Sequence, residues 1–200
     1  MTSNQPYDFS EDLTEERLRV VCDLVLDTVQ DSIEDSGTKH DTAWTRGCLR
    51  YGRVQGLFSQ LTLDKDYPWI SLANSTMDFT FRIGNTHVQY IYDDYECPKK
   101  IHRLRPNAIE NMQLEIAFET EEKPEVLTWR LFVHQDLDED FSELKATLVG
   151  YDINQSPICT WFFEDKANVP VLAERAETVE LPEPLLTRKT SHGKVSNETD

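Results

Sequence analysis

The feature that most constrains this sequence is a change in the spacing of its apolar residues near Pro68. Before Pro68, apolar residues recur every three or four positions, which is the period of an α-helix with one buried face. After Pro68, polar and apolar residues alternate in short runs, which is the period of a β-strand with one buried face. The sequence therefore predicts an α+β fold, with helices first and strands afterwards.

Two helices are predicted before the change of period, at about 13–34 and 42–60. Asp12 and Glu15 have the spacing of a capping box at the start of the first helix. The short link between the helices predicts an antiparallel helical hairpin. The apolar face of the second helix is predicted to comprise Trp44, Cys48, Tyr51 and Phe58. The same helix has glycines at 47, 52 and 56, which would let another backbone approach closely.

About six strands are predicted after Pro68, separated by turn-rich and acidic linkers. The predicted strands are 77–83, 86–92, 113–119, 126–135, 142–151 and 158–164. Gly84-Asn85 is a turn signal that predicts a hairpin between the first two. The short linkers favour an antiparallel meander, and the helical hairpin would cover its apolar face.

The ends of the chain are polar and are broken by prolines. We therefore expect a flexible N-terminus at 1–11, a single α+β domain at 12–165 and an extended or disordered tail at 166–200. The N-terminus lacks the apolar segment of a signal peptide, and no apolar run approaches the length that spans a bilayer. The expectation is a cytoplasmic protein without membrane contact, whose four cysteines are reduced.

The charge of the chain limits its partners. The chain has 20 basic and 37 acidic side chains, which gives a net charge of −17. Such a field repels nucleic-acid backbones and anionic lipids, so direct nucleic-acid binding is not expected. A basic protein partner fits this charge, and the sequence does not define the oligomeric state.

Arg46, Arg50 and Arg53 follow one another at helical spacing in the second predicted helix. Arginine forks match phosphate and carboxylate groups, so this stripe could grip an anionic ligand. The alternative is internal: the first helix has an acidic row that could face the arginines. That row comprises Asp23, Asp27, Asp31 and Glu34.

A second basic cluster lies in the predicted loop 99–106. Its basic residues are Lys99, Lys100, His102, Arg103 and Arg105. In an acidic chain, this cluster could bind an acidic partner segment or a phosphate. It could equally be a solvated loop, or a dock for the acidic tail of the same chain.

An enzymatic alternative comes from the charged residues near 143. Glu143 and Lys145 have the Glu-x-Lys form seen in metal-dependent nucleases. The carboxylates that could complete such a site are Asp78, Asp93 and Glu115. The acidic run from 136 starts like a calcium loop but lacks the glycine and the last glutamate, so it is interpreted as a hairpin loop. The spacings of zinc ligands and the known cofactor motifs do not occur, so no cofactor is predicted.

The order of features in 44–163 resembles a group of small uncharacterised proteins of prophages and other mobile elements. The matching features are WTRGCLRYGRVQGLF, FTFRIGNTHVQYIY, KKIHRLRPNA, WRLFVHQD and CTWFFE. Genes of this group often neighbour helix-turn-helix repressors and putative peptidases. The resemblance implies toxin–antitoxin or phage-defence biology, and it transfers no catalytic residue.

These observations favour a non-enzymatic, acidic protein-binding module. It would act as an antitoxin, an immunity protein, an accessory protein or a DNA-mimic inhibitor. The alternative is a metal-dependent nuclease toxin or another hydrolase.

Overall fold

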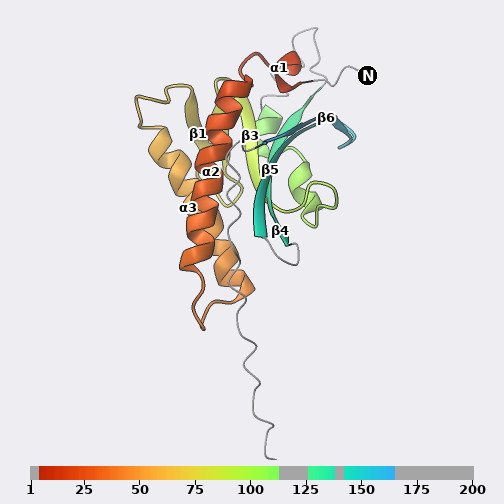
Figure 1. The fold of residues 1–200 in the computed structure, drawn as a ribbon. Helices are drawn as coiled ribbons and strands as arrows, with labels where there is room; N and C mark the ends of the chain where they lie inside the picture. Colours follow the sequence, from red (N-terminus) through yellow and green to blue (C-terminus); the bar gives the residue numbers. More distant parts are fainter. Residues whose placement is uncertain (1–4, 113–125, 138–141, 165–200) are drawn as a thin grey trace, which may run out of the picture.

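The computed structural model describes residues 5–112, 126–137 and 142–164, and it shows an α+β fold (Figure 1). The helices α1 (Pro6–Phe9), α2 (Glu15–Asp35) and α3 (Ala43–Leu61) precede the sheet. The strands are β1 (Ile70–Asn74), β2 (Thr80–Ile83), β3 (Thr86–Tyr92), β4 (Thr128–Leu137), β5 (Ser142–Tyr151) and β6 (Pro157–Phe162). The predicted fold class, a helical hairpin on an antiparallel sheet of about six strands, is confirmed, with a six-stranded sheet that is mostly antiparallel.

The six strands lie side by side in the order of the sequence, from β1 to β6. All neighbours are antiparallel except β3 and β4, which are parallel, with Tyr90 opposite Leu131. The predicted meander is therefore wrong at this pair. A parallel pair needs a connection that returns along the sheet, so the chain between β3 and β4 must cross one face. Strand β1 was not predicted, and the strand predicted at 113–119 lies outside the described residues.

Both faces of the sheet are covered in its centre. Figure 1 shows α2 and α3 on one side and the connection between β3 and β4 on the other. The helix side includes Val25, Phe58, Phe81, Tyr90 and Leu131, all buried in one cluster. On the other side, a smaller cluster gathers Ile91, Leu104, Phe132, Val149 and Tyr151. Burial on both faces explains why four successive residues of β3, Val88, Gln89, Tyr90 and Ile91, are all buried.

The sequence predicted Asp12 at the start of α2, but the residue that caps the helix is Thr14. The Thr14 hydroxyl accepts a hydrogen bond from the Arg17 backbone N–H at 3.4 Å. The Asp12 carboxylate accepts instead from the Arg17 guanidinium at 3.0 Å and from the Asn85 backbone N–H at 2.8 Å. Asp12 therefore fastens the turn between β2 and β3, where Gly84 has a φ of 57°, to the start of α2.

The N-terminal half of α3 does not contribute the apolar face that the sequence predicted. Trp44 is 75% exposed, and Cys48 is also exposed. The buried residues of α3 are Val54, Phe58 and Leu61, in its second half. A Cβ atom at position 47, 52 or 56 would meet nothing within 4 Å, so the expected close backbone approach at these glycines is wrong.

The expected N-terminal segment 1–11 includes α1, whose Phe9 ring contacts the Trp129 ring edge-on with a centroid distance of 6.4 Å. The expected tail at 166–200 lies outside the described residues. Within the part of the chain that the structure describes, no helix is long and apolar enough to cross a membrane. The proposed domain limits stay a prediction.

Two glycine-to-alanine substitutions should have opposite effects on stability. A Cβ atom at Gly150 in β5 would lie 2.8 Å from Trp129 Cζ3 and 2.8 Å from Val126 Cγ1. Gly150→Ala should therefore lower the free energy of unfolding by about 1–3 kcal/mol through overpacking. Gly56→Ala, in open space on α3, should raise it by about 1 kcal/mol through helix propensity. Urea denaturation measures both, and a Gly150→Ala protein as stable as the parent would contradict the packing described here.

Candidate functional site

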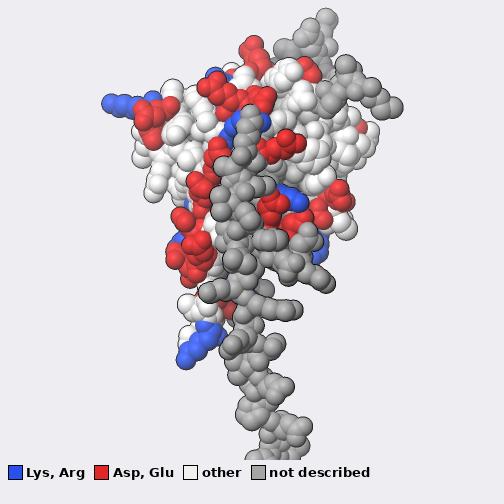
Figure 2. Space-filling model, in the orientation of Figure 1, with Lys and Arg blue, Asp and Glu red and all other residues white. Residues whose placement is uncertain are grey.

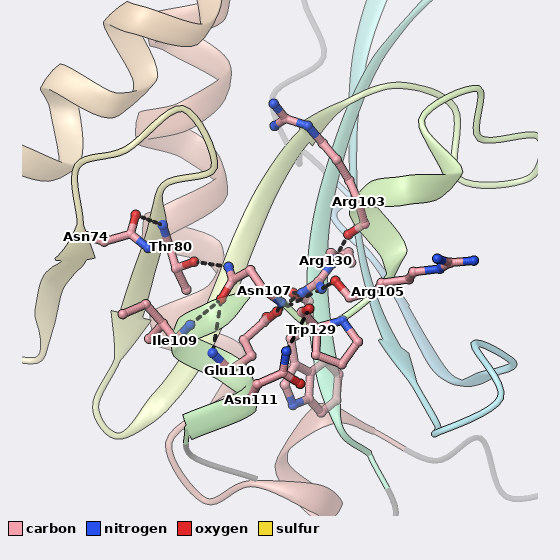
Figure 3. A network of polar contacts seen from close by, with 11 residues as sticks. Asn74, Thr80, Arg103, Arg105, Asn107, Ile109, Glu110, Asn111, Trp129 and Arg130 are labelled. Atoms are coloured by element: carbon pink, nitrogen blue, oxygen red, sulfur yellow. Dashed lines mark hydrogen bonds and ion pairs between the residues drawn. The ribbon is translucent and has the colours of Figure 1, made fainter. Parts of the chain in front are cut away.

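The connection between β3 and β4 is fastened to the sheet by Arg130, a fully buried arginine of β4. Its Nη1 and Nη2 donate to the two carboxylate oxygens of Glu110 at 2.5 and 2.9 Å. The remaining hydrogen bonds go to the carbonyls of Arg103 (2.6 Å), Trp129 (2.9 Å) and Arg105 (3.0 Å) (Figure 3). These five bonds use the five N–H donors of a guanidinium, so Arg130 has none left for a ligand. Its role is to hold the connection in place.

The short helical segment that carries Glu110 has a second attachment to the sheet. The Asn107 side-chain amide donates to the Thr80 hydroxyl at 2.6 Å. Asn107 Oδ1 accepts from the Glu110 backbone N–H at 3.0 Å, and the Glu110 carboxylate accepts from the Asn107 backbone N–H at 2.9 Å. This network was not predicted from the sequence. The available signal was an arginine between apolar residues of a predicted strand, where a buried charge needs a partner.

The network leaves the side chains of Arg103 and Arg105 pointing away from Arg130 (Figure 3). The Arg103 guanidinium lies 5.0 Å from the centroid of the Tyr51 ring on α3 and 3.2 Å from the Asp78 carboxylate. It also donates to the Met77 carbonyl at 3.3 Å, to which the Tyr51 hydroxyl donates as well. The second basic cluster therefore contacts the helix that carries the first.

Arg50 and Lys100 meet at the same place. The Arg50 guanidinium lies 4.0 Å from the centroid of the Tyr92 ring, at the end of β3. The Lys100 ammonium donates to the Tyr92 carbonyl at 2.8 Å. We call Arg50, Lys100 and Arg103 the cationic corner. It joins one residue of the predicted arginine stripe to two residues of the predicted basic loop.

Burial and charge at the cationic corner disfavour the charged form of Lys100. Partial burial lowers the pKa of Lys100, and the positive charges of Arg103 and Arg50 lower it as well, against the opposite effect of Asp93. Arg50 Nε is buried and has no hydrogen-bond partner. The Tyr90 hydroxyl is also buried and unpartnered, in a side chain that is 1% exposed. A buried donor without an acceptor costs about 1–3 kcal/mol.

The other predicted binding residues lie apart from the cationic corner or at its margin. Arg53 turns to α2, where its guanidinium lies 2.6 Å from the Asp35 carboxylate and donates to the Asp31 carbonyl at 3.3 Å. Arg53 therefore pairs with a carboxylate of α2, as the internal alternative for the arginine stripe predicted. The partner is Asp35, which was not in the acidic row named from the sequence. Arg46, Lys99 and Arg105 are exposed.

The alternative catalytic residues are only partly brought together. Asp93, Glu143 and Lys145 line one groove of about 1110 Å³ between the loop after β3 and the ends of β4, β5 and β6. Asp78 lies elsewhere, where it forms an ion pair with Arg103 of the cationic corner. Glu115 lies outside the described residues.

The polar groups of this groove are engaged with one another. The Lys145 ammonium lies 2.8 Å from the Asp136 carboxylate, which lowers the pKa of Asp136, and 3.7 Å from that of Glu143. Asp93 accepts hydrogen bonds from the backbone N–H groups of Lys99 and Lys100 at 2.8 and 3.0 Å. Among the described residues, no three His, Cys, Asp or Glu side chains are placed to hold a metal ion. The antiparallel pairing of β4 with β5 agrees with the expected hairpin, and it places Asp136 and Glu143 opposite each other within the strands. Residues 138–141 lie outside the described residues.

The exposed side of α2 carries the acidic row predicted from the sequence. Figure 2 shows carboxylates along the course of this helix. Asp23, Asp27, Asp31 and Glu34 are all exposed, and Asp35 continues the four-residue spacing of the three aspartates. The last turn of α2 contains no basic residue. The exposed side of α2 therefore carries a row of carboxylates toward its C-terminal end, and the last of them, Asp35, pairs with Arg53.

Comparison with family models, with curated proteins and with solved structures finds no match to this chain.

Removing the charge of Glu110 should strongly destabilise the protein. Glu110→Gln leaves Arg130 as a buried cation without a counter-ion, which costs about 3–5 kcal/mol of unfolding free energy. Urea denaturation measures the loss. Glu16→Gln, at an exposed position of α2, is the control and should change stability by less than about 0.5 kcal/mol. A Glu110→Gln loss as small as that of the control would show that the ion pair does not hold the connection.

Proposed function

We propose that this protein is a non-enzymatic, acidic protein-binding module, and that α2 is its contact surface for a basic partner. The observation that supports the proposal is the row of Asp23, Asp27, Asp31 and Asp35 at successive i, i+4 positions of α2. These carboxylates are exposed in the chain as described.

The row is unfavourable for the stability of the chain on its own. Like charges at i, i+4 destabilise a helix by about 0.2–0.5 kcal/mol for each pair. Carboxylates near the C-terminus of a helix also oppose its dipole, at a cost of about 0.3–1 kcal/mol each. Arg53 offsets part of this cost at Asp35. A basic partner along Asp27 and Asp31 would offset the cost at these positions, which is the arrangement expected of a binding surface.

The net charge of −17 extends this local argument to the approach of the partner. A large field of one sign speeds the encounter with a molecule of the opposite sign and makes the association sensitive to salt. The same field disfavours direct contact with nucleic acid, so a partner protein is the better fit.

The biological setting remains part of the proposal. The resemblance of 44–163 to proteins of prophages and other mobile elements supports an antitoxin, immunity, accessory or DNA-mimic role in phage defence. Such a role would place the protein in the cytoplasm.

A metal-dependent hydrolase is the second candidate, because Asp93, Glu143 and Lys145 line the same groove. The contacts of Asp93 weigh against it: one oxygen accepts two backbone N–H groups of its own loop, and the other accepts the Asp94 N–H at 3.1 Å. A carboxylate whose two oxygens already accept backbone hydrogen bonds is poorly placed to bind a cation. Magnesium-dependent cleavage of DNA or RNA by the parent protein, abolished by Glu143→Gln, would establish the enzyme instead.

The binding proposal predicts that a variant of α2 gains stability while it loses its partner. Asp27→Asn/Asp31→Asn removes two repelling charges with little change in helix propensity. The free energy of unfolding should rise by about 0.5–1 kcal/mol. Capture of partners from the native host, at low and at physiological salt, should lose the salt-sensitive partner that the parent protein retains.

The matched control is Asp64→Asn/Asp66→Asn, which removes the same charge from the exposed loop between α3 and β1. This control should retain the partner. If the α2 variant captures the partner as well as the parent does, or if the control loses it equally, the contact surface does not lie on α2.

A further inference from the structure

We propose that the cationic corner formed by Arg50, Lys100 and Arg103 is a binding site for a phosphate-type oxyanion. This site lies apart from the acidic row of α2, and it would give an acidic protein a second, oppositely charged ligand.

The three cations come from two segments that the fold brings together. Arg50 lies on α3, whereas Lys100 is the N-cap residue of the 3₁₀ helix η1 (Ile101–Leu104) and Arg103 lies within it. Their convergence depends on the Arg130 network, since Arg130 binds the backbone carbonyl of Arg103 itself. A site whose two segments are already held together is pre-organised, which reduces the cost of binding.

Two of the three cations lie over aromatic rings. The Arg50 and Arg103 guanidinium groups lie over the rings of Tyr92 and Tyr51, at 4.0 and 5.0 Å from the centroids. A stacked guanidinium keeps its N–H groups in the plane of the fork, where they can donate to two oxygens of one phosphate.

The cationic corner is under-compensated by carboxylates. Arg103 pairs with Asp78, and Lys100 donates to a carbonyl, with Asp93 as its nearby negative charge. No carboxylate of the described segments pairs with Arg50. This is notable in a chain with 37 acidic side chains.

Two buried donors at the cationic corner also have no acceptor, the Arg50 Nε and the Tyr90 hydroxyl. Both atoms are closed to solvent, so a bound oxyanion would contact the other N–H groups of Arg50 and would relieve the repulsion among the three cations.

The negative net charge of the chain does not prevent an oxyanion from binding at the cationic corner. At physiological ionic strength the field of a charge decays over about 8 Å, so a ligand in the cationic corner responds to the nearest groups more than to the carboxylates of α2. The natural ligand is either free phosphate or the phosphate monoester of a small molecule, which share the same anionic group.

The test is a titration of the full chain with inorganic phosphate and, separately, with glycerol phosphate, followed by ³¹P NMR and calorimetry. The parent protein should bind one of the two saturably at or below about 10 mM, which is the weak end of specific association. Saturable binding of inorganic phosphate would show that the free ion is sufficient as a ligand. Binding of the ester alone identifies a phosphorylated small molecule.

Variants assign the binding to the cationic corner. Arg50→Gln and Lys100→Gln should each weaken binding by about tenfold or more, the scale of one lost charged contact. Arg46→Gln is the matched control, because it removes the same charge from an exposed position one helical turn away on α3, and it should weaken binding less than about twofold. Arg50→Lys, which keeps the charge and loses the fork, should give an intermediate loss and decides the case if Arg50→Gln does not fold.

The proposal is overturned if neither ligand binds saturably, or if Arg50→Gln and Arg46→Gln weaken binding equally. The α2 variant Asp27→Asn/Asp31→Asn should bind phosphate as the parent does. Failure of the phosphate site is therefore distinguishable from failure of the protein-binding proposal.

Discussion

The buried ion pair between Arg130 and Glu110 is the interaction on which the rest of this structure depends. Moving two charges out of water costs free energy, and this cost is offset only when the geometry of the pair is good and the remaining donors are satisfied. Here the pair is bidentate, and three backbone carbonyls complete the coordination of Arg130. Two of these carbonyls belong to the connection between β3 and β4. The pair therefore decides where that connection lies, and the parallel pairing of β3 with β4 is compatible only with such a crossing.

The local elements of this fold could be predicted from the sequence, whereas the path between them could not. The period of the apolar residues is a local property, and it gave α2, α3 and the hairpin of β2 and β3. The direction of β4 relative to β3 depends on Arg130 and Glu110, which are 20 residues apart and pair only in the folded chain. The end of the apolar face of α3 at Tyr51 was also not predictable. Trp44 and Cys48 fit the helical period but extend past the sheet that would cover them.

The candidate site was predictable as two separate basic clusters but not as one corner. Helical spacing put Arg46, Arg50 and Arg53 in one stripe. The structure divides the stripe, because α3 lies between α2 and the end of β3. Arg53 reaches the carboxylate of Asp35, while Arg50 reaches the ring of Tyr92. The partner that a long side chain contacts depends on how the helices and strands are arranged, and the sequence alone does not give this arrangement. The result is a small fold with a negative surface along α2 and a positive corner beside α3, separated by the ion pair of Arg53 and Asp35.

The complete use of the Arg130 donors has a consequence for the divergence of this chain. A lysine at this position has three donors and no planar fork, so it cannot replace the arginine, and neither partner of the pair is tolerated alone. The two positions can change only together. Chains of common descent should therefore keep an acidic residue upstream of an arginine inside a strand, even after the helices and loops around them have lost all similarity. That pair is a better signature for recognising them than any stretch of contiguous sequence.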